Sequence, residues 1–194
     1  MSRSSTEPHG LWDEALRPTA PSPPSGWTPS GMGSAVGSHL VDVHDHLRHE
    51  LARLLEAIDQ VREGRATTAD ARQVMSELTL SQHDWAVGAY CARYCSVVTQ
   101  HHGIEDAAVF PHLRAANPEL APVIDRLQDE HVAIHGVLVE VDRLLVEYMG
   151  STGDVVMLQA AVGVLAEALV SHLAYEEHEV IPSLQRFGMF PGQV

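Results

Sequence analysis

The sequence has few basic residues. Lys and Arg together number 12, against 26 Asp and Glu, in a chain of 194 residues. With histidine neutral, the net charge at pH 7 is −14. Such a negative field repels nucleic-acid phosphates and anionic lipid headgroups. We therefore expect a protein that binds neither nucleic acid nor a membrane surface.

The marks of secreted and membrane proteins are also lacking. The two cysteines, Cys91 and Cys95, lie four residues apart and cannot form a disulfide framework. No stretch approaches the ~18 uninterrupted apolar residues of a membrane span. No apolar run follows Arg3, as it would in a signal peptide. We expect a cytoplasmic protein without a membrane partner.

Residues 1–37 lack a hydrophobic pattern that could form a core. They contain six of the 11 prolines, separated by Gly and Ser. Such a composition cannot bury enough apolar surface to offset the entropy lost on ordering. We expect a disordered N-terminal tail, in which Trp12, Leu16 and Trp27 are the positions most able to dock on a folded domain.

Beyond residue 37 the pattern becomes helical, with apolar residues at alternating steps of three and four. Four long helices are expected at about 38–64, from 81 to the Asn117-Pro118 pair, between Pro122 and Gly150, and at 154–187, with a shorter one at 68–78. No segment shows the alternation of a half-buried strand. The sequence predicts an all-α protein, an antiparallel four-helix bundle over residues 38–187, followed by a short tail at 188–194.

The 13 histidines follow this helical pattern. Residues at i and i+4 lie about 40° apart on a helix, and three such pairs fall on apolar stripes. A further histidine, His44, continues the stripe of Leu40 and Leu47. Seven side chains are therefore expected to meet inside the bundle: His44, His101, Glu105, His131, His135, His172 and Glu176.

Metal binding is the simplest way to bury so many polar groups, because each one left without a partner costs several kcal/mol. Five imidazoles and two carboxylates form a borderline N/O ligand set, which suits iron better than calcium or magnesium. Seven ligands exceed what one ion usually takes, so we expect two ions that share bridging carboxylates. Cys91 and Cys95 are expected to pack in the core.

An internal repeat supports this interpretation. Residues 101–106 align with residues 172–177 at an offset of 71, and Phe110-Pro111 then aligns with Ile181-Pro182. Two copies of one ligand-bearing helix predict pseudo-two-fold symmetry around a shared centre. The Glu-x-x-His pattern of ferritin-like bundles does not occur on these helices, and neither does the H-E-x-x-H of zinc proteases.

Three segments carry a family resemblance: HHGIEDAAVFPHL, DEHVAIH and HLAYEEHEVIPSL. Their order and spacing resemble the hemerythrin family, specifically the bacterial HHE cation-binding domain, over residues 38–187. The resemblance implies a non-haem di-iron site with an oxo or hydroxo bridge. The imidazole ligands would be His44, His101, His131, His135 and His172, and the bridging carboxylates would be Glu105 and Glu176.

The resemblance implies binding of dioxygen or related small ligands, such as peroxide or nitric oxide. Two alternatives stay open: a di-iron enzyme with peroxidase-like, catalase-like or nitric-oxide-handling activity, and a protein for iron storage or for iron or oxygen sensing. The last helix departs from the H-x4-D of respiratory hemerythrins. Helical geometry favours Glu176 over Glu177, which points about 140° from His172. On the second helix, His102 and Asp106 form a competing pair that could orient a ligand imidazole.

Overall fold

The computed structural model describes residues 10–63, 83–150 and 153–194, and for 83–87 the backbone alone. These residues form helices and contain no strand. The long helices are α1 (Gly31–Arg62), α3 (His83–Ile104), α5 (Ala121–Met149) and α6 (Val155–Phe187). The short elements are η1 (Glu14–Leu16), the π-helical turn η2 (Glu105–Val109), α4 (Phe110–Ala116) and η3 (Pro118–Leu120). The prediction of an all-α protein is confirmed.

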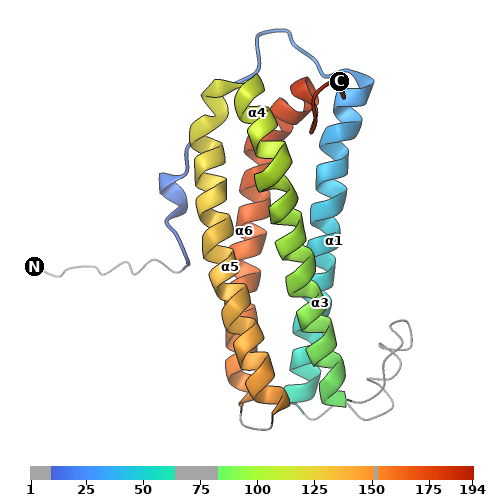
Figure 1. The fold of residues 1–194 in the computed structure, drawn as a ribbon, viewed down its shortest axis with the longest axis vertical. Helices are drawn as coiled ribbons and strands as arrows, with labels where there is room; N and C mark the ends of the chain where they lie inside the picture. The colour runs from blue at the N-terminus through green and yellow to red at the C-terminus, as the bar shows by residue number, and fades with distance from the viewer. Residues whose placement is uncertain (1–9, 64–82, 151–152) are drawn as a thin grey trace, which may run out of the picture.

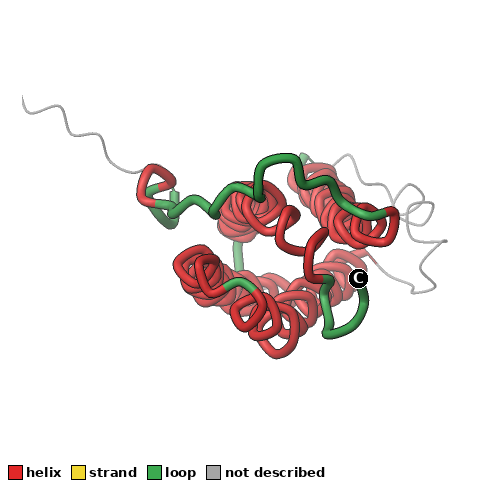
Figure 2. Tube along the Cα trace, turned by 90° about the horizontal axis from the view of Figure 1, so that it is seen from above, coloured by secondary structure: helices red, strands yellow, loops and turns green. Residues whose placement is uncertain are grey.

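The four long helices form a bundle. In Figure 1, α1 and α5 run downwards, while α3 and α6 run upwards. The helix α1 packs against α3 and α6, and α5 packs against the same two helices. Seen from above, the helices therefore surround a common axis (Figure 2). Side chains that point to this axis from all four helices can meet.

The ends of the helices follow local sequence. Ser30 caps α1, because its Oγ accepts a hydrogen bond from the Gly33 amide at 2.9 Å. The helix thus begins seven residues before residue 38, where the sequence pattern placed its start. Asp154 caps α6 through its side chain, close to the expected start of this helix, and Gly188 follows the helix with a φ of 78°. The helix expected at 68–78 lies outside the described residues, and so does Ser81, the expected start of the second long helix.

The core consists of two hydrophobic clusters, one on each side of a polar layer. One cluster includes Leu54 and Leu165, and the other includes Phe110 and Ile124. Cys91 is buried in the first cluster, as predicted for a packing residue. On α1 and α5 the polar side chains lie between the parts that enter the two clusters, and on α3 they precede η2 and α4, which enter the second cluster. Apolar packing thus closes the polar layer from both ends.

Helix α6 is long and apolar enough to cross a membrane by length and composition alone, since its most apolar window has a mean hydropathy of 1.7. The core helix of a bundle passes the same test. In this fold α6 packs against α1 and α5 and contributes to both hydrophobic clusters.

Residues 10–30 differ from the expected disordered tail. They run beside α5 and across the end of the bundle to α1 (Figures 1 and 2). The Tyr175 hydroxyl donates to the carbonyl of Pro18 at 2.7 Å, and Arg17 pairs with Glu130. Trp12, one of the positions expected to be able to dock on a folded domain, packs against the first hydrophobic cluster. The expectation of disorder is wrong here because polar contacts, which composition does not reveal, hold the segment. Residues 1–9 lie outside the described part.

Candidate metal centre

Seven buried or nearly buried side chains meet between the two hydrophobic clusters. Their potential ligand atoms form two groups, and within each group these atoms lie within 4.8 Å of one another. The first group is His102, His131 and His172. The second group is His44, His101, Glu105 and Glu176. Every long helix contributes, so the bundle itself brings the groups together.

The structure brings six of the seven expected residues into this layer, and His135 is the exception. Its side chain is exposed on α5, whereas His131 and Ile134 are buried. The buried stripe of α5 continues from His131 through Ile134 to Leu138, by steps of three and four. The centre of this stripe lies about 80° from His135. Spacing of four from His131 was therefore not enough to place His135 inside.

His102 takes the remaining place in the layer, although the sequence suggested an outer role for it. Its side chain is 5% exposed, and its ring stacks on that of His131 with centroids 4.0 Å apart. The sequence did hold a signal. His102 lies four residues after the buried Val98 and three before the buried Glu105, so it fits the same stripe as His101.

A π-helical turn follows directly after these two histidines. The Phe110 amide donates to the carbonyl of Glu105, five residues earlier. The turn inserts one extra residue, and Val109 and Leu113 are the buried residues that follow it. Single π-turns of this kind are frequent at functional sites. Pro111 lies in the first turn of α4, directly after the π-helical turn, where a proline is tolerated.

Glu176 and Glu177 occupy different environments. Glu176 is 1% exposed and lies in the layer. Glu177 lies outside it, where its Oε1 accepts hydrogen bonds from His44 Nδ1 at 2.9 Å and from Arg48 Nη2 at 2.8 Å. The choice of Glu176 from helical geometry thus agrees with the structure. Glu177 holds the ring of His44 from outside the layer.

Three histidines are held by carboxylates on the outer side of the layer. His44 Nδ1 bonds to Glu177, His131 Nδ1 to Asp106 at 3.0 Å, and His172 Nδ1 to Glu130 at 3.1 Å. Ligand histidines of metal sites commonly bond to carboxylates in this way, which fixes the ring and its tautomer. The Nε2 atoms of all three rings therefore point inwards.

The inward nitrogens approach one another closely. His44 Nε2 lies 3.1 Å from His101 Nε2, and His131 Nε2 lies 3.1 Å from His172 Nε2. The two glutamates complete the cluster. Glu105 Oε1 lies 3.3 Å from His101 Nε2, and Glu105 Oε2 lies 3.6 Å from His131 Nε2. Glu105 thus reaches from one group of ligands to the other.

Burial sets the protonation states of the layer. It lowers the pKa of His44 to about 2 and the pKa values of His101 and His172 to about 4, with like charge on neighbouring histidines acting in the same direction. These rings are therefore neutral at pH 7, the form that binds metal. Burial also raises the pKa of Glu176 to about 8 and raises that of Glu105.

Four atoms of the layer are buried without a hydrogen-bond partner among the described residues: both oxygens of Glu105, Glu176 Oε2 and His102 Nε2. Orphaned polar atoms are rare in folded proteins and point to a missing partner. All four can act as acceptors, so a bound cation is a partner that suits them all. The set of imidazole nitrogens and carboxylate oxygens suits a borderline metal such as iron. The residues present therefore fit a metal.

Other histidines of the bundle lie away from the centre. His46, His49 and His178 are exposed. His112 Nε2 bonds to the carbonyl of Phe187 at 2.9 Å, which ties α4 to the end of α6.

Comparison with known proteins agrees with this arrangement. No curated protein and no solved structure matches the chain. The model of the hemerythrin HHE cation-binding domain matches residues 35–184, which include all seven side chains of the layer. The chain therefore belongs to the hemerythrin HHE cation-binding domain family.

Proposed function

We propose that this protein is a non-haem di-iron protein that binds dioxygen, or a related small ligand such as peroxide or nitric oxide, in the core of an antiparallel four-helix bundle. The His131–His172 pair is the observation that supports a bound cation most strongly. Each ring bonds through Nδ1 to a carboxylate, and their Nε2 atoms lie 3.1 Å apart.

The protonation states of Asp106 and Glu130 determine which ring nitrogen of His131 and His172 donates a hydrogen bond. Although burial acts in the opposite direction, hydrogen bonds from His172 and Arg17 lower the pKa of Glu130 to about 2. The hydrogen bond from His131 likewise prevails over burial and lowers the pKa of Asp106. Both carboxylates are ionised at pH 7 and accept hydrogen bonds only, so each ring donates to its carboxylate through Nδ1. The two Nε2 atoms then face each other, and a cation bound by both would be a partner for each of them.

Two ions fit better than one. The ligand atoms form two groups, and each glutamate is near both. Glu176 Oε2 lies 3.4 Å from His44 Nε2 and 3.9 Å from His172 Nε2, and Glu105 makes a similar bridge. Bridging carboxylates are the usual feature of di-iron sites in helical bundles. The protein groups do not fill the coordination of two six-coordinate ions, which leaves room for solvent and a small ligand.

The chain holds this centre away from water. Packing around Phe110 closes the layer on one side, and packing around Leu54 closes it on the other. The stacked rings of His102 and His131 restrict each other's rotation. When bound, a ferrous pair supplies the electrons for dioxygen chemistry. We further propose that the protein is cytoplasmic and that it binds neither nucleic acid nor membrane; the net charge of −14 supports the second part.

Anaerobic loading with ferrous iron tests this function. We expect about two irons per chain, as in other di-iron bundles, and a visible absorption that changes when oxygen is admitted. An absorption that reverses when oxygen is removed supports ligand binding. Steady turnover of hydrogen peroxide or nitric oxide would instead establish the enzymatic alternative. Failure to bind iron, with zinc retained in its place, would overturn the di-iron proposal.

A further inference from the structure

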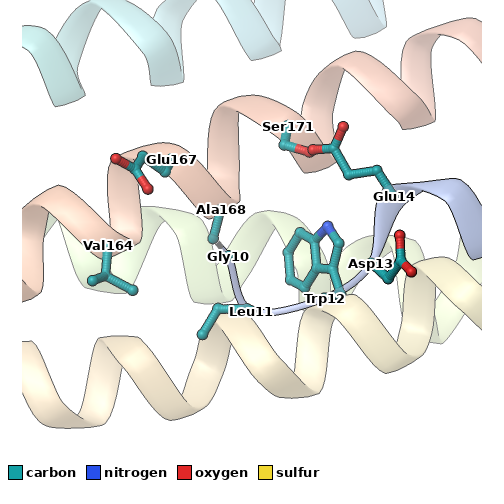
Figure 3. A pocket seen from close by; sticks show the side chains of 9 residues that line it. All are labelled: Gly10, Leu11, Trp12, Asp13, Glu14, Val164, Glu167, Ala168 and Ser171. Atoms are coloured by element: carbon teal, nitrogen blue, oxygen red, sulfur yellow. The ribbon is translucent and has the colours of Figure 1, made fainter. Parts of the chain in front are cut away.

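Residues 10–20, which we call the N-terminal strap, lie outside the part of the chain that matches the family. The strap lies along α6 (Figure 3), Trp12 packs against the first hydrophobic cluster, and the guanidinium of Arg126 on α5 lies over the Trp12 ring. Glu14 accepts a hydrogen bond from the Ser171 hydroxyl, and the Ala20 amide donates to Glu179. The strap is thus fixed to α6 along the stretch that contributes His172.

Arg17 extends from the strap to a buried carboxylate. Its Nε and Nη2 donate to the two oxygens of Glu130, both at 2.9 Å. Glu130 is 1% exposed, and the Arg17 guanidinium lies over the ring of Tyr175 at 4.6 Å. A bidentate pair of this kind restricts the carboxylate in both distance and orientation.

The two oxygens of Glu130 have different partners. Oε1 accepts from Arg17 Nε and from Arg126 Nε, the latter at 2.8 Å. Oε2 accepts from Arg17 Nη2 and from His172 Nδ1, the latter at 3.1 Å. Arg126 therefore supports the oxygen that faces away from the histidine, whereas Arg17 also holds the oxygen that orients it.

We propose that the N-terminal strap is part of the metal centre: Arg17 positions Glu130, Glu130 orients His172, and strap docking and metal binding therefore stabilise each other. This inference rests on the proposed metal site. The coupling must be reciprocal, because a strap that improves metal affinity is in turn held more tightly when the metal is bound. Arg17 is a positioning residue in this account, since it acts through Glu130.

Ferrous-iron affinity, measured anaerobically by competition with a chelator on the full chain, tests the proposal. We expect Arg17→Ala to weaken iron binding 10–100-fold, the usual effect of losing a group that orients a ligand. Arg17→Lys should recover part of this loss, because lysine restores the charge without the bidentate fork. Arg126→Ala is the matched control and should weaken binding less, since Arg126 bonds to the other oxygen.

Two further measurements separate positioning from general destabilisation. In the Glu130→Gln background, Arg17→Ala should cause no further loss of affinity. In the wild-type chain, hydrogen exchange at the Ala20 amide should be about tenfold slower with iron than without it, as expected for an ordinary coupling. This second measurement needs no variant, so it applies even if Arg17→Ala does not fold.

The possible outcomes are distinct. Wild-type affinity and absorption in Arg17→Ala would overturn the strap proposal while leaving the metal site intact. Equal losses of iron affinity in Arg17→Ala and Arg126→Ala would also overturn the strap proposal. The same holds if hydrogen exchange at the Ala20 amide has the same rate with and without iron. If the wild-type chain binds no iron at all, the proposed function fails first, and this inference fails with it.

Discussion

His131 and His172 direct their Nε2 atoms at each other across 3.1 Å, while a carboxylate bonds to the Nδ1 atom of each ring. The two Nε2 atoms therefore face each other inside the bundle. The nearby oxygens of Glu105 are buried without hydrogen-bond partners. The metal-free fold therefore contains several unfavourable contacts that bound cations would relieve.

Metal loading should therefore raise thermal stability. A ligand present at a thousand times its dissociation constant stabilises the native state by about 4 kcal/mol. For a chain of this size, that corresponds to an increase in Tm of roughly 10 °C. Calorimetry of iron-loaded and chelator-treated protein measures the difference. An unchanged Tm at saturating iron would show that iron does not bind the folded layer.

Substitutions of His102 and His135 distinguish a ligand from a residue outside the layer. We expect His102→Ala to lose iron from the group that it forms with His131 and His172. We expect His135→Ala to keep the wild-type iron content, because His135 is exposed. Metal analysis of the purified variants measures both. Retention of iron by His102→Ala together with loss by His135→Ala would reverse the assignment.

The metal-free protein should show a characteristic dependence of stability on pH. Burial raises the pKa of Glu176 from 4.5 to about 8, so between these values the folded state holds a proton that the unfolded chain has released. The contribution of this group to stability therefore falls as pH rises through this window. Burial lowers the pKa values of His101 and His172 from 6.5 to about 4, so their contribution falls as pH decreases below 6.5. The two opposite trends predict maximal metal-free stability at about pH 6.5.

Glu176→Gln isolates one side of this dependence. With chelator present, the variant should be more stable than wild type at about pH 8.5, where the native carboxylate is ionised, buried and unpaired. The difference should become small near pH 4, where the carboxyl is mostly protonated in both states. Urea unfolding at the two pH values measures it. Equal stability at the higher pH would contradict the buried, unpaired state of Glu176.

Close contact between α1 and α6 gives a test of the fold itself. A Cβ atom on Gly33 would lie 2.1 Å from the carbonyl oxygen of Gln185. Gly33→Ala should therefore destabilise the protein by about 1–3 kcal/mol, the usual effect of overpacking. At Gly163 a Cβ would meet nothing within 4 Å, and Gly163→Ala should stabilise the helix by about 0.5–1 kcal/mol. Chemical denaturation of both variants checks the contrast.

Much of this architecture could be predicted from helical periodicity alone. Steps of three and four placed α5 and α6 and identified most of the polar layer, including His44 and Glu176. The wrong predictions concern residues near a departure from ideal helical geometry, or residues at the edge of a buried stripe. His135 lies at the edge of the α5 stripe, and the π-turn after Glu105 moves burial by one residue, which no periodic pattern can reveal.

The N-terminal strap shows a second limit of sequence patterns. Its composition indicated disorder, because proline, glycine and serine bury little apolar surface. The structure holds it through Arg17 on Glu130 and through Tyr175 on the Pro18 carbonyl. These contacts join residues more than 100 positions apart, and neither partner carries a local signal for the other.

Anomalous X-ray diffraction at the iron edge, on crystals of iron-loaded protein, tests the central claim most directly. We expect two peaks in the polar layer, one beside His102, His131 and His172, and the other beside His44, His101, Glu105 and Glu176. The absence of a peak in this layer, or a single peak beside His135 on the surface, would contradict it.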